Sequence, residues 1–158
     1  MQSATASRGL DYVGGRSRFA RTGLMLTQAF VAVTALAGGS ALIVAELLPQ
    51  TATVLSPPED YLLGTPFTSY LVPGLLLAVV VGGVHTAAFL LNLTRSSWRV
   101  LGAATAGFAL LIWIFVQMVF IPFSFLQAVY FVAGLAEIGL IMLALGITDP
   151  AAGESRSR

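Results

Sequence analysis

Four long apolar runs make up most of the chain, and short segments of polar and turn-forming residues separate them. A helix of roughly 18 or more apolar residues can cross a bilayer, because it rises about 1.5 Å per residue and satisfies its own backbone polar groups. The pattern predicts membrane-spanning helices at residues 23–48, 68–93, 100–121 and 126–147. The expected fold is all-α, an integral membrane four-helix bundle over residues 23–148.

The connection between the first two spans contains helix-capping signals. Ser56 is a candidate N-cap, Pro57 stands at the first helical position, and Glu59 is placed to complete a capping box. Gly64 follows the last apolar residue of this segment. The pattern predicts a short outer interfacial helix over residues 57–63.

Further caps and prolines delimit the other elements. Thr65 followed by Pro66 predicts that the second span begins near Pro66, and Pro73 falls inside that helix and should kink it. Between the third and fourth spans, Ser124 and Gln127 form a capping-box pattern after a tight turn. These two spans are therefore expected to form an antiparallel hairpin.

Composition agrees with a membrane protein and narrows its chemistry. The 158 residues are 57% hydrophobic and 9% charged, whereas soluble domains carry about 25% charged residues. No cysteine is present, which excludes disulfides, thiolate metal sites and electron transfer through paired cysteines. The single histidine, His85, cannot supply both axial imidazoles of a haem, although a symmetric dimer could.

Every basic residue is an arginine, and the arginines lie in alternate connections. By the positive-inside rule, both termini and the 94–99 loop are expected in the cytoplasm, while the 49–67 and 122–125 connections face outward. The tails at 1–22 and 149–158 are rich in Ser, Gly and Arg, which predicts disorder. The arginines are Arg8, Arg16, Arg18, Arg21, Arg95, Arg99, Arg156 and Arg158.

The arginine-rich start has two alternative interpretations. With the apolar stretch 24–34 and the triplet Ala35-Leu36-Ala37, it imitates a secretory signal peptide and its cleavage site. The apolar run continues to Leu48, however, which favours a membrane anchor. The arginines could also contact anionic lipids, although a topology signal is the simpler explanation.

Small and polar residues recur at alternating steps of four and three along each span. Because lipid is as apolar as a leucine side chain, such residues mark helix–helix interfaces, and one stripe per span predicts a compact bundle. The small residues Gly74, Ala78 and Gly82 could serve packing within the chain or pairing between chains. The stripes are Gln28, Ala32, Ala35, Gly39, Leu42 and Glu46; Gly74, Ala78, Val81, His85, Ala88 and Asn92; Ala103, Ala106, Leu110, Trp113, Gln117 and Phe120; and Gln127, Tyr130, Gly134, Glu137 and Ile141.

Two polar residues fall deep inside the predicted spans. His85 and Glu137 lie about 12 and 15 Å from the cytoplasmic boundary, counting about 1.5 Å per residue. A carboxylate in hydrocarbon costs several kcal/mol, so Glu137 should be either protonated or paired with a donor. The pair is a candidate proton-transfer or ligand-coordinating site, and the simpler alternative is an interhelical hydrogen bond that fixes packing.

A second group of polar residues is expected near the outer boundary. Glu46, Gln117 and Gln127 lie within about 6 Å of it by the same count. They form a candidate outer polar cluster, for which interfacial anchoring is the simpler explanation. The sequence predicts no metal site and specifies no cofactor.

Two segments carry a resemblance to known proteins. GTPFTSYLVPGLLLAVVVGG and SFLQAVYFVAGLAEIGLIMLALG are similar to a recurrent pattern in small four-span inner-membrane proteins of bacteria that carry no assigned function. The resemblance implies a bacterial inner-membrane protein and no particular activity. Four-helix multidrug exporters differ, because their working carboxylate lies deep in the first helix, whereas Glu46 lies at its outer end.

Three functions fit these features. The first is a non-enzymatic accessory or structural component that associates with itself or with a larger membrane complex. The second is a small oligomeric proton-linked transporter using His85 and Glu137, and the third is a membrane enzyme that binds quinone or a lipid near His85. The expected partners are the lipid bilayer and further membrane subunits, with no nucleic acid.

Overall fold

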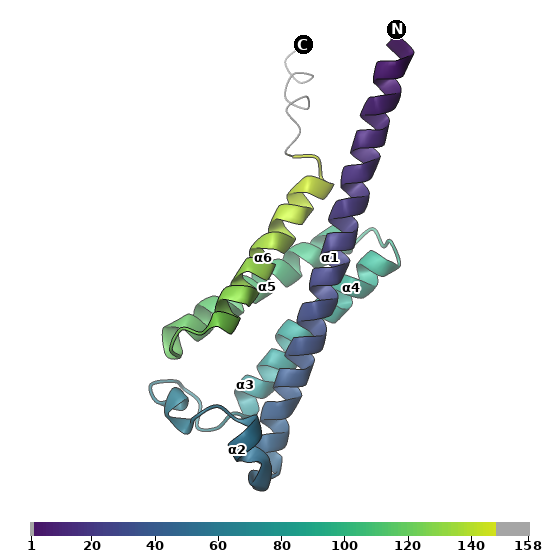
Figure 1. Ribbon diagram of the computed structural model, residues 1–158. Helices are drawn as coiled ribbons and strands as arrows, with labels where there is room; N and C mark the ends of the chain where they lie inside the picture. Colours follow the sequence, from purple (N-terminus) through teal and green to yellow (C-terminus); the bar gives the residue numbers. More distant parts are fainter. Residues whose placement is uncertain (1, 148–158) are drawn as a thin grey trace.

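The computed structural model describes residues 2–147, and it describes side chains from residue 18 onward. This part of the chain is helical and contains no β-strand. Helix α1 spans Gln2–Leu47, and the next long rod joins α3 (Leu71–Leu76), η3 (Leu77–Gly83) and α4 (Val84–Leu93). Helices α5 (Arg99–Phe120) and α6 (Phe125–Ala144) complete the bundle (Figure 1).

Four helical stretches are long and apolar enough to cross a membrane: Arg18–Leu47, Leu71–Leu93, Arg99–Phe120 and Phe125–Ala144. They agree with the four predicted spans to within a few residues. Helix α1 begins at Gln2 rather than near Gly23, so it runs through the segment for which composition predicts disorder. The predicted tail at 149–158 lies outside the described residues.

The connection after α1 differs from the prediction. It contains a 3-10 turn η1 (Pro49–Thr51), a single α-helical turn α2 (Ala52–Leu55) and a second 3-10 turn η2 (Glu59–Leu62). The predicted helix at 57–63 is reduced to the 3-10 turn η2, and the predicted cap is wrong. The turn begins only at Glu59 because Pro58 is itself extended (φ −52°, ψ 139°), so Pro58 rather than Ser56 precedes it, and Ser56 ends α2. A residue before proline favours extended backbone, and Pro57-Pro58 imposes this twice in succession.

The second rod begins at Leu71 rather than at Pro66. Residues 65–70 form bends, and the Thr65 hydroxyl donates to the Leu62 carbonyl at 2.8 Å. Pro73 therefore lies in the first helical turn, where its missing N–H would have no intrahelical partner anyway. The departure from α geometry occurs later, in η3, which is π-helical.

The turn between α5 and α6 confirms the predicted hairpin. The Gln127 backbone N–H donates to Ser124 Oγ at 3.3 Å, and the Ser124 N–H donates to Gln127 Oε1 at 2.9 Å. This reciprocal capping box satisfies two N–H groups at the start of α6. Helices α5 and α6 pack along one another (Figure 1).

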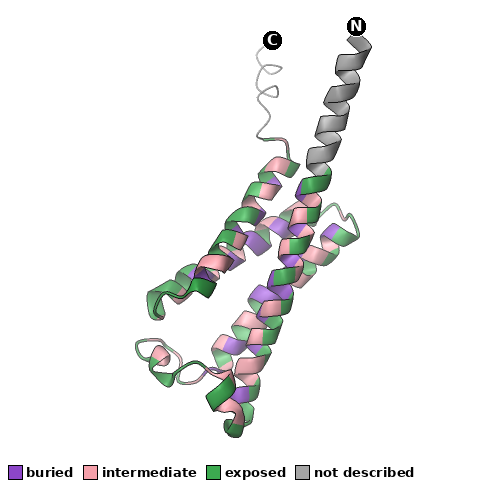
Figure 2. Cartoon of the chain, in the orientation of Figure 1, coloured by how far each residue is buried: buried purple, intermediate pink, exposed green. Residues whose placement is uncertain are grey.

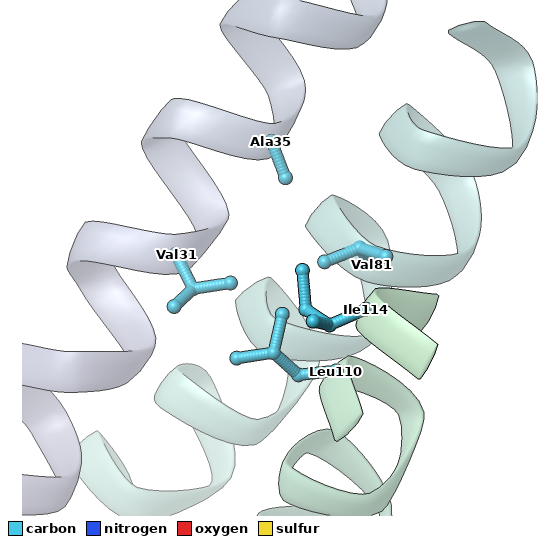
Figure 3. Close-up of a cluster of buried hydrophobic side chains, with 5 residues drawn as sticks. All are labelled: Val31, Ala35, Val81, Leu110 and Ile114. Carbon is cyan, nitrogen blue, oxygen red and sulfur yellow. The ribbon is translucent and has the colours of Figure 1, made fainter. Parts of the chain in front are cut away.

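The predicted stripes face the interior, and of their members only Phe120 is exposed. Five buried residues from three of the rods form the larger hydrophobic cluster, drawn in Figure 3: Val31, Ala35, Val81, Leu110 and Ile114. A second cluster, Leu24, Ala103 and Ile141, lies toward the other end of the bundle. Exposed residues cover the outer faces of the helices (Figure 2).

Candidate functional site

A polar layer lies between the two hydrophobic clusters. On α1, Gln28 lies between Leu24 of the second cluster and Val31 of the first. On α6, Glu137 lies between Tyr130, which packs against the first cluster, and Ile141 of the second. His85, Gln28 and Glu137 have no exposed surface, and Asn92 is 3% exposed. The interior of the bundle therefore holds several polar groups that solvent does not reach.

The structure brings together the two residues that the sequence singles out. His85 Nε2 on α4 lies 3.4 Å from Glu137 Oε2 on α6. This is close enough for an ion pair but longer than a charge-assisted hydrogen bond, which spans about 2.7–2.9 Å. The depth estimate from sequence, which places both residues at a similar level, agrees with this contact.

The other nitrogen of His85 fixes the tautomer. Nδ1 lies 2.7 Å from the Val81 carbonyl oxygen, one turn earlier. Because a carbonyl oxygen only accepts, Nδ1 carries a hydrogen and donates it. Nε2 consequently faces Glu137 either as a bare lone pair or as a second N–H, and only the latter makes His85 a cation.

This assignment limits the pair to a small set of protonation states. A bare Nε2 can accept from a protonated Glu137, whereas a protonated Nε2 can donate to an ionised Glu137. Both states are electrically neutral overall and differ only in the position of one shared proton. Neutrality matters here, because burying a net charge costs several kcal/mol.

Several polar atoms at this level have no hydrogen-bond partner. Within the described residues, they include His85 Nε2, both carboxyl oxygens of Glu137, and Gln28 Nε2. An unpaired buried polar group costs about 1–3 kcal/mol. The layer is thus only partly satisfied, which is uncommon for a purely structural network.

A glycine makes room for the Glu137 side chain. A Cβ added at Gly107 of α5 would lie 3.3 Å from Glu137 Cβ and 3.4 Å from Glu137 Oε2. One added at Gly134 of α6 would lie 2.8 Å from the side chain of Leu111. The two glycines therefore let α5 and α6 approach closely where the carboxyl group enters the bundle.

The π-helical segment η3 ends just before His85. His85 binds the Val81 carbonyl and Thr86 Oγ1 donates to the Gly82 carbonyl at 2.7 Å, so two successive side chains bind carbonyls of this segment. Such side-chain bonds compete with the regular helical ladder. Short π segments frequently lie at functional sites.

Sequence reasoning did not identify a second buried contact in the same region. Asn92 Nδ2 donates to Gln28 Oε1 at 3.0 Å, joining α4 to α1. Arg21 adds to this junction, because its Nη2 donates to the Asn92 carbonyl at 3.0 Å. The sequence does place Gln28 and Asn92 on the polar stripes of their two helices. The spacing within each helix cannot show, however, that these two residues pair with each other.

The outer polar residues do not form one cluster. Glu46 Oε1 accepts from the Tyr70 backbone N–H at 2.8 Å and so ties the end of α1 to the start of α3. Gln127 belongs to the capping box with Ser124. Gln117 lines two small cavities described next, one of which Gln127 also lines.

Three cavities adjoin these residues. One of about 200 Å³ lies among α1, η3, α5 and α6 and reaches Val81, and another of about 180 Å³ opens beneath the outer loop. These two share the residues Leu77, Trp113, Gln117 and Ile121. The third, of about 740 Å³, lies at the opposite end of the bundle and reaches Asn92.

Among the described side chains, no group of three or more His, Asp or Glu residues could hold a metal ion. The chemistry that the site offers is therefore proton binding by one imidazole and one carboxyl group. Comparison with protein-family models, curated proteins and solved structures finds no match for this chain.

Proposed function

We propose that this chain is a multi-pass protein of the bacterial inner membrane, with both termini and the 94–99 loop in the cytoplasm. Large apolar side chains on the outward helix faces support membrane insertion, since Leu26, Val79, Ile112 and Phe115 are each at least 63% exposed. Soluble monomers rarely expose apolar surface on this scale, whereas lipid solvates it. The four described arginines lie at one end of the bundle, in agreement with the positive-inside rule.

Within this bundle, the His85–Glu137 pair is the proton-binding site of a small proton-linked carrier. The observation that carries this function is the 3.4 Å contact between two fully buried titratable groups. Because Nδ1 donates to Val81, the pair is neutral when it holds one shared proton. Removing that proton leaves a buried negative charge, and adding another leaves a buried positive charge, so either change alters the energy of the bundle strongly.

The loose geometry favours this function over a purely structural hydrogen bond. A structural bond would pair its donor and acceptor at ordinary distance, whereas Nε2 and both Glu137 oxygens have no hydrogen-bond partner. Ionisable residues inside membrane spans are costly and are usually retained for function. The neighbouring π segment provides a part of the helix that can rearrange when the pair gains or loses its proton.

Neither His85 nor Glu137 lines any of the three cavities. One outer cavity comes close to the pair because it is lined by Val81, whose carbonyl binds His85, and the larger cavity reaches Asn92, two turns beyond His85 on α4. Each outer cavity is smaller than the roughly 300 Å³ of a typical ligand pocket. A substrate path would therefore need a second copy of the chain, so the carrier is an oligomer.

His85 can be observed alone, because it is the single histidine of the chain. We would label the purified protein with ¹⁵N-histidine in lipid nanodiscs and follow both ring nitrogens by NMR between about pH 5 and 9. We expect Nδ1 to stay protonated, since it donates to the Val81 carbonyl. Glu137→Gln should change how the Nε2 signal responds to pH, because an amide cannot take up or release the proton that the pair shares.

Glu46→Gln is the matched control, since it makes the same chemical change at a carboxyl group outside the pair. Proton uptake into proteoliposomes loaded with a pH-sensitive dye then tests the carrier itself. Loss of uptake in Glu137→Gln and His85→Asn, but not in Glu46→Gln, would support it. A His85 signal that does not change with pH, and that is the same in Glu137→Gln and Glu46→Gln, would indicate that the pair has only a structural role. That result would favour the accessory function. A copurifying quinone or isoprenoid would favour the third function instead.

A further inference from the structure

A large cavity lies at the end of the bundle that carries the arginines. It has a volume of about 740 Å³ and is lined by residues of α1, α4, α5, α6 and the 94–99 loop. Four of its lining residues are arginines: Arg18, Arg21, Arg95 and Arg99. None of its described lining residues is acidic. From this arrangement we infer that the cavity binds a phosphate group.

The charge of the cavity favours an anion. Guanidinium groups remain ionised at any physiological pH, and several facing one space repel each other. Arg21 is partly compensated by the Asn92 and Leu93 carbonyls at the end of α4. For the other three, phosphate is a suitable partner because its oxygens match the planar fork of a guanidinium.

The start of α5 adds to the positive potential. Arg99 and Val100 occupy its first turn and line the cavity, and Trp98 at the N-cap position makes no side-chain capping bond. The Arg99 N–H donates to the Ser96 carbonyl at 3.2 Å, so the N-terminus of this 22-residue helix attracts anions through its dipole and the N–H groups that follow Arg99. The cavity therefore combines four arginines with a helix end of the same sign.

The remaining lining is apolar, including Leu24, Val100, Ile141 and Leu145. A phosphate that carries an acyl chain would contact both the arginines and this surface, as an anionic lipid does. A soluble phosphate ester would use the arginines alone. The site is independent of the His85–Glu137 pair, so failure of one proposal leaves the other standing.

Arg95 offers a variant that separates folding from binding. It has a φ of 55°, a left-handed conformation that glycine adopts without strain. Arg95→Gly should therefore leave the fold as stable or more stable while removing one cationic ligand. Arg99→Gln removes a second one, at the start of α5. Ser97→Asp lowers the net charge equally in the same loop without lining the cavity.

The test is native mass spectrometry of the full chain released from neutral detergent and titrated with phosphatidylglycerol or phosphatidylcholine. We expect one phosphatidylglycerol per chain, bound more tightly than phosphatidylcholine. The affinity should fall about tenfold in Arg95→Gly and in Arg99→Gln, the loss of roughly one charge-assisted bond. It should change little in Ser97→Asp.

Competition experiments show whether the bound phosphate belongs to a lipid or to a soluble molecule. Displacement of phosphatidylglycerol by glycerol 3-phosphate or inorganic phosphate at similar concentration would support a site for soluble phosphate. Failure of both to compete would support a lipid site. Equal affinity for the two lipids, or an equal loss in Ser97→Asp and the arginine variants, would overturn the proposal, because either result indicates diffuse attraction rather than a built site.

Discussion

Gly39 of α1 and Gly74 of α3 pack backbone against backbone. A Cβ added at Gly39 would lie 2.6 Å from the Gly74 carbonyl oxygen, and one added at Gly74 would lie 3.0 Å from the Gly39 carbonyl oxygen. Together with Gly82, which packs against Leu36, these glycines place the small-residue series of the second span against α1. The series is therefore used for packing within the chain.

Gly39→Ala should destabilise the bundle by about 1–3 kcal/mol, the usual cost of overpacking a close contact. The added methyl group meets backbone atoms, which cannot move aside without separating α1 from α3. Thermal unfolding in detergent, followed by circular dichroism, measures the loss.

Gly139→Ala is the control for this change. Gly139 is exposed within α6 and an added Cβ meets nothing within 4 Å. There the substitution should be neutral or stabilising by up to about 1 kcal/mol, because alanine is the better helix former. Equal unfolding temperatures for the two variants would contradict the packing argument.

Ser124→Ala should cost about 1 kcal/mol, the typical value for loss of an N-cap side chain. The substitution removes the acceptor at 3.3 Å from the Gln127 N–H and breaks the capping box that begins α6. Denaturant unfolding of this variant and of Ser97→Ala, at an exposed serine outside any helix, gives the comparison. A cost as small for Ser124 as for Ser97 would show that the cap contributes nothing.

The local features that the sequence predicts correctly depend on periodicity or on short-range contacts. The four stripes need only the helical repeat, and the Ser124–Gln127 box joins residues three apart. The His85–Glu137 contact could be anticipated because few polar residues lie deep in the spans, so depth alone paired them. Each of these inferences uses either the residue spacing within one helix or the depth of a residue along its membrane span.

The features that the sequence misses depend on contacts between distant segments. Ser56 is a residue type that commonly caps a helix, but Pro58 is extended and the helical turn begins only at Glu59, three residues after Ser56. The start of the second rod is set at Leu71, where Glu46 binds the Tyr70 N–H from another helix. The Gln28–Asn92 bond joins residues 64 positions apart, which no local pattern encodes.

The proposed orientation predicts which loops can be labelled from outside the cell. The chain has no cysteine, so a single cysteine at Ser97 or at Thr53, both exposed, reports on one loop at a time. In intact cells, a membrane-impermeant maleimide should label Thr53→Cys and spare Ser97→Cys until the cells are opened. The reverse pattern would invert the topology, and with it the cytoplasmic placement of the arginine-lined cavity.

Tyr70 predicts how stability responds to alkaline pH. It lies just before α3, and its hydroxyl donates to the Pro58 carbonyl at 2.6 Å. Burial raises the pKa of Tyr70 above its ordinary value of 10.0, and the negative charges of Asp60, Tyr61 and Glu59 raise it further. Because the folded state holds this proton more tightly than the unfolded state, its contribution is complete below about pH 10 and is lost as pH rises through the folded pKa.

Tyr70→Phe should therefore lower stability at neutral pH by about 0.5–1.5 kcal/mol, through loss of the hydrogen bond. It should also reduce the fall in stability above about pH 10, because phenylalanine has no proton to lose. Unfolding midpoints measured from neutral to alkaline pH test both effects. Tyr130→Phe is the control, since that ring stacks on Phe30 with centroids 6.0 Å apart and keeps this contact without its hydroxyl. A decline at alkaline pH that is as steep in Tyr70→Phe as in the native chain would mean that another group is responsible.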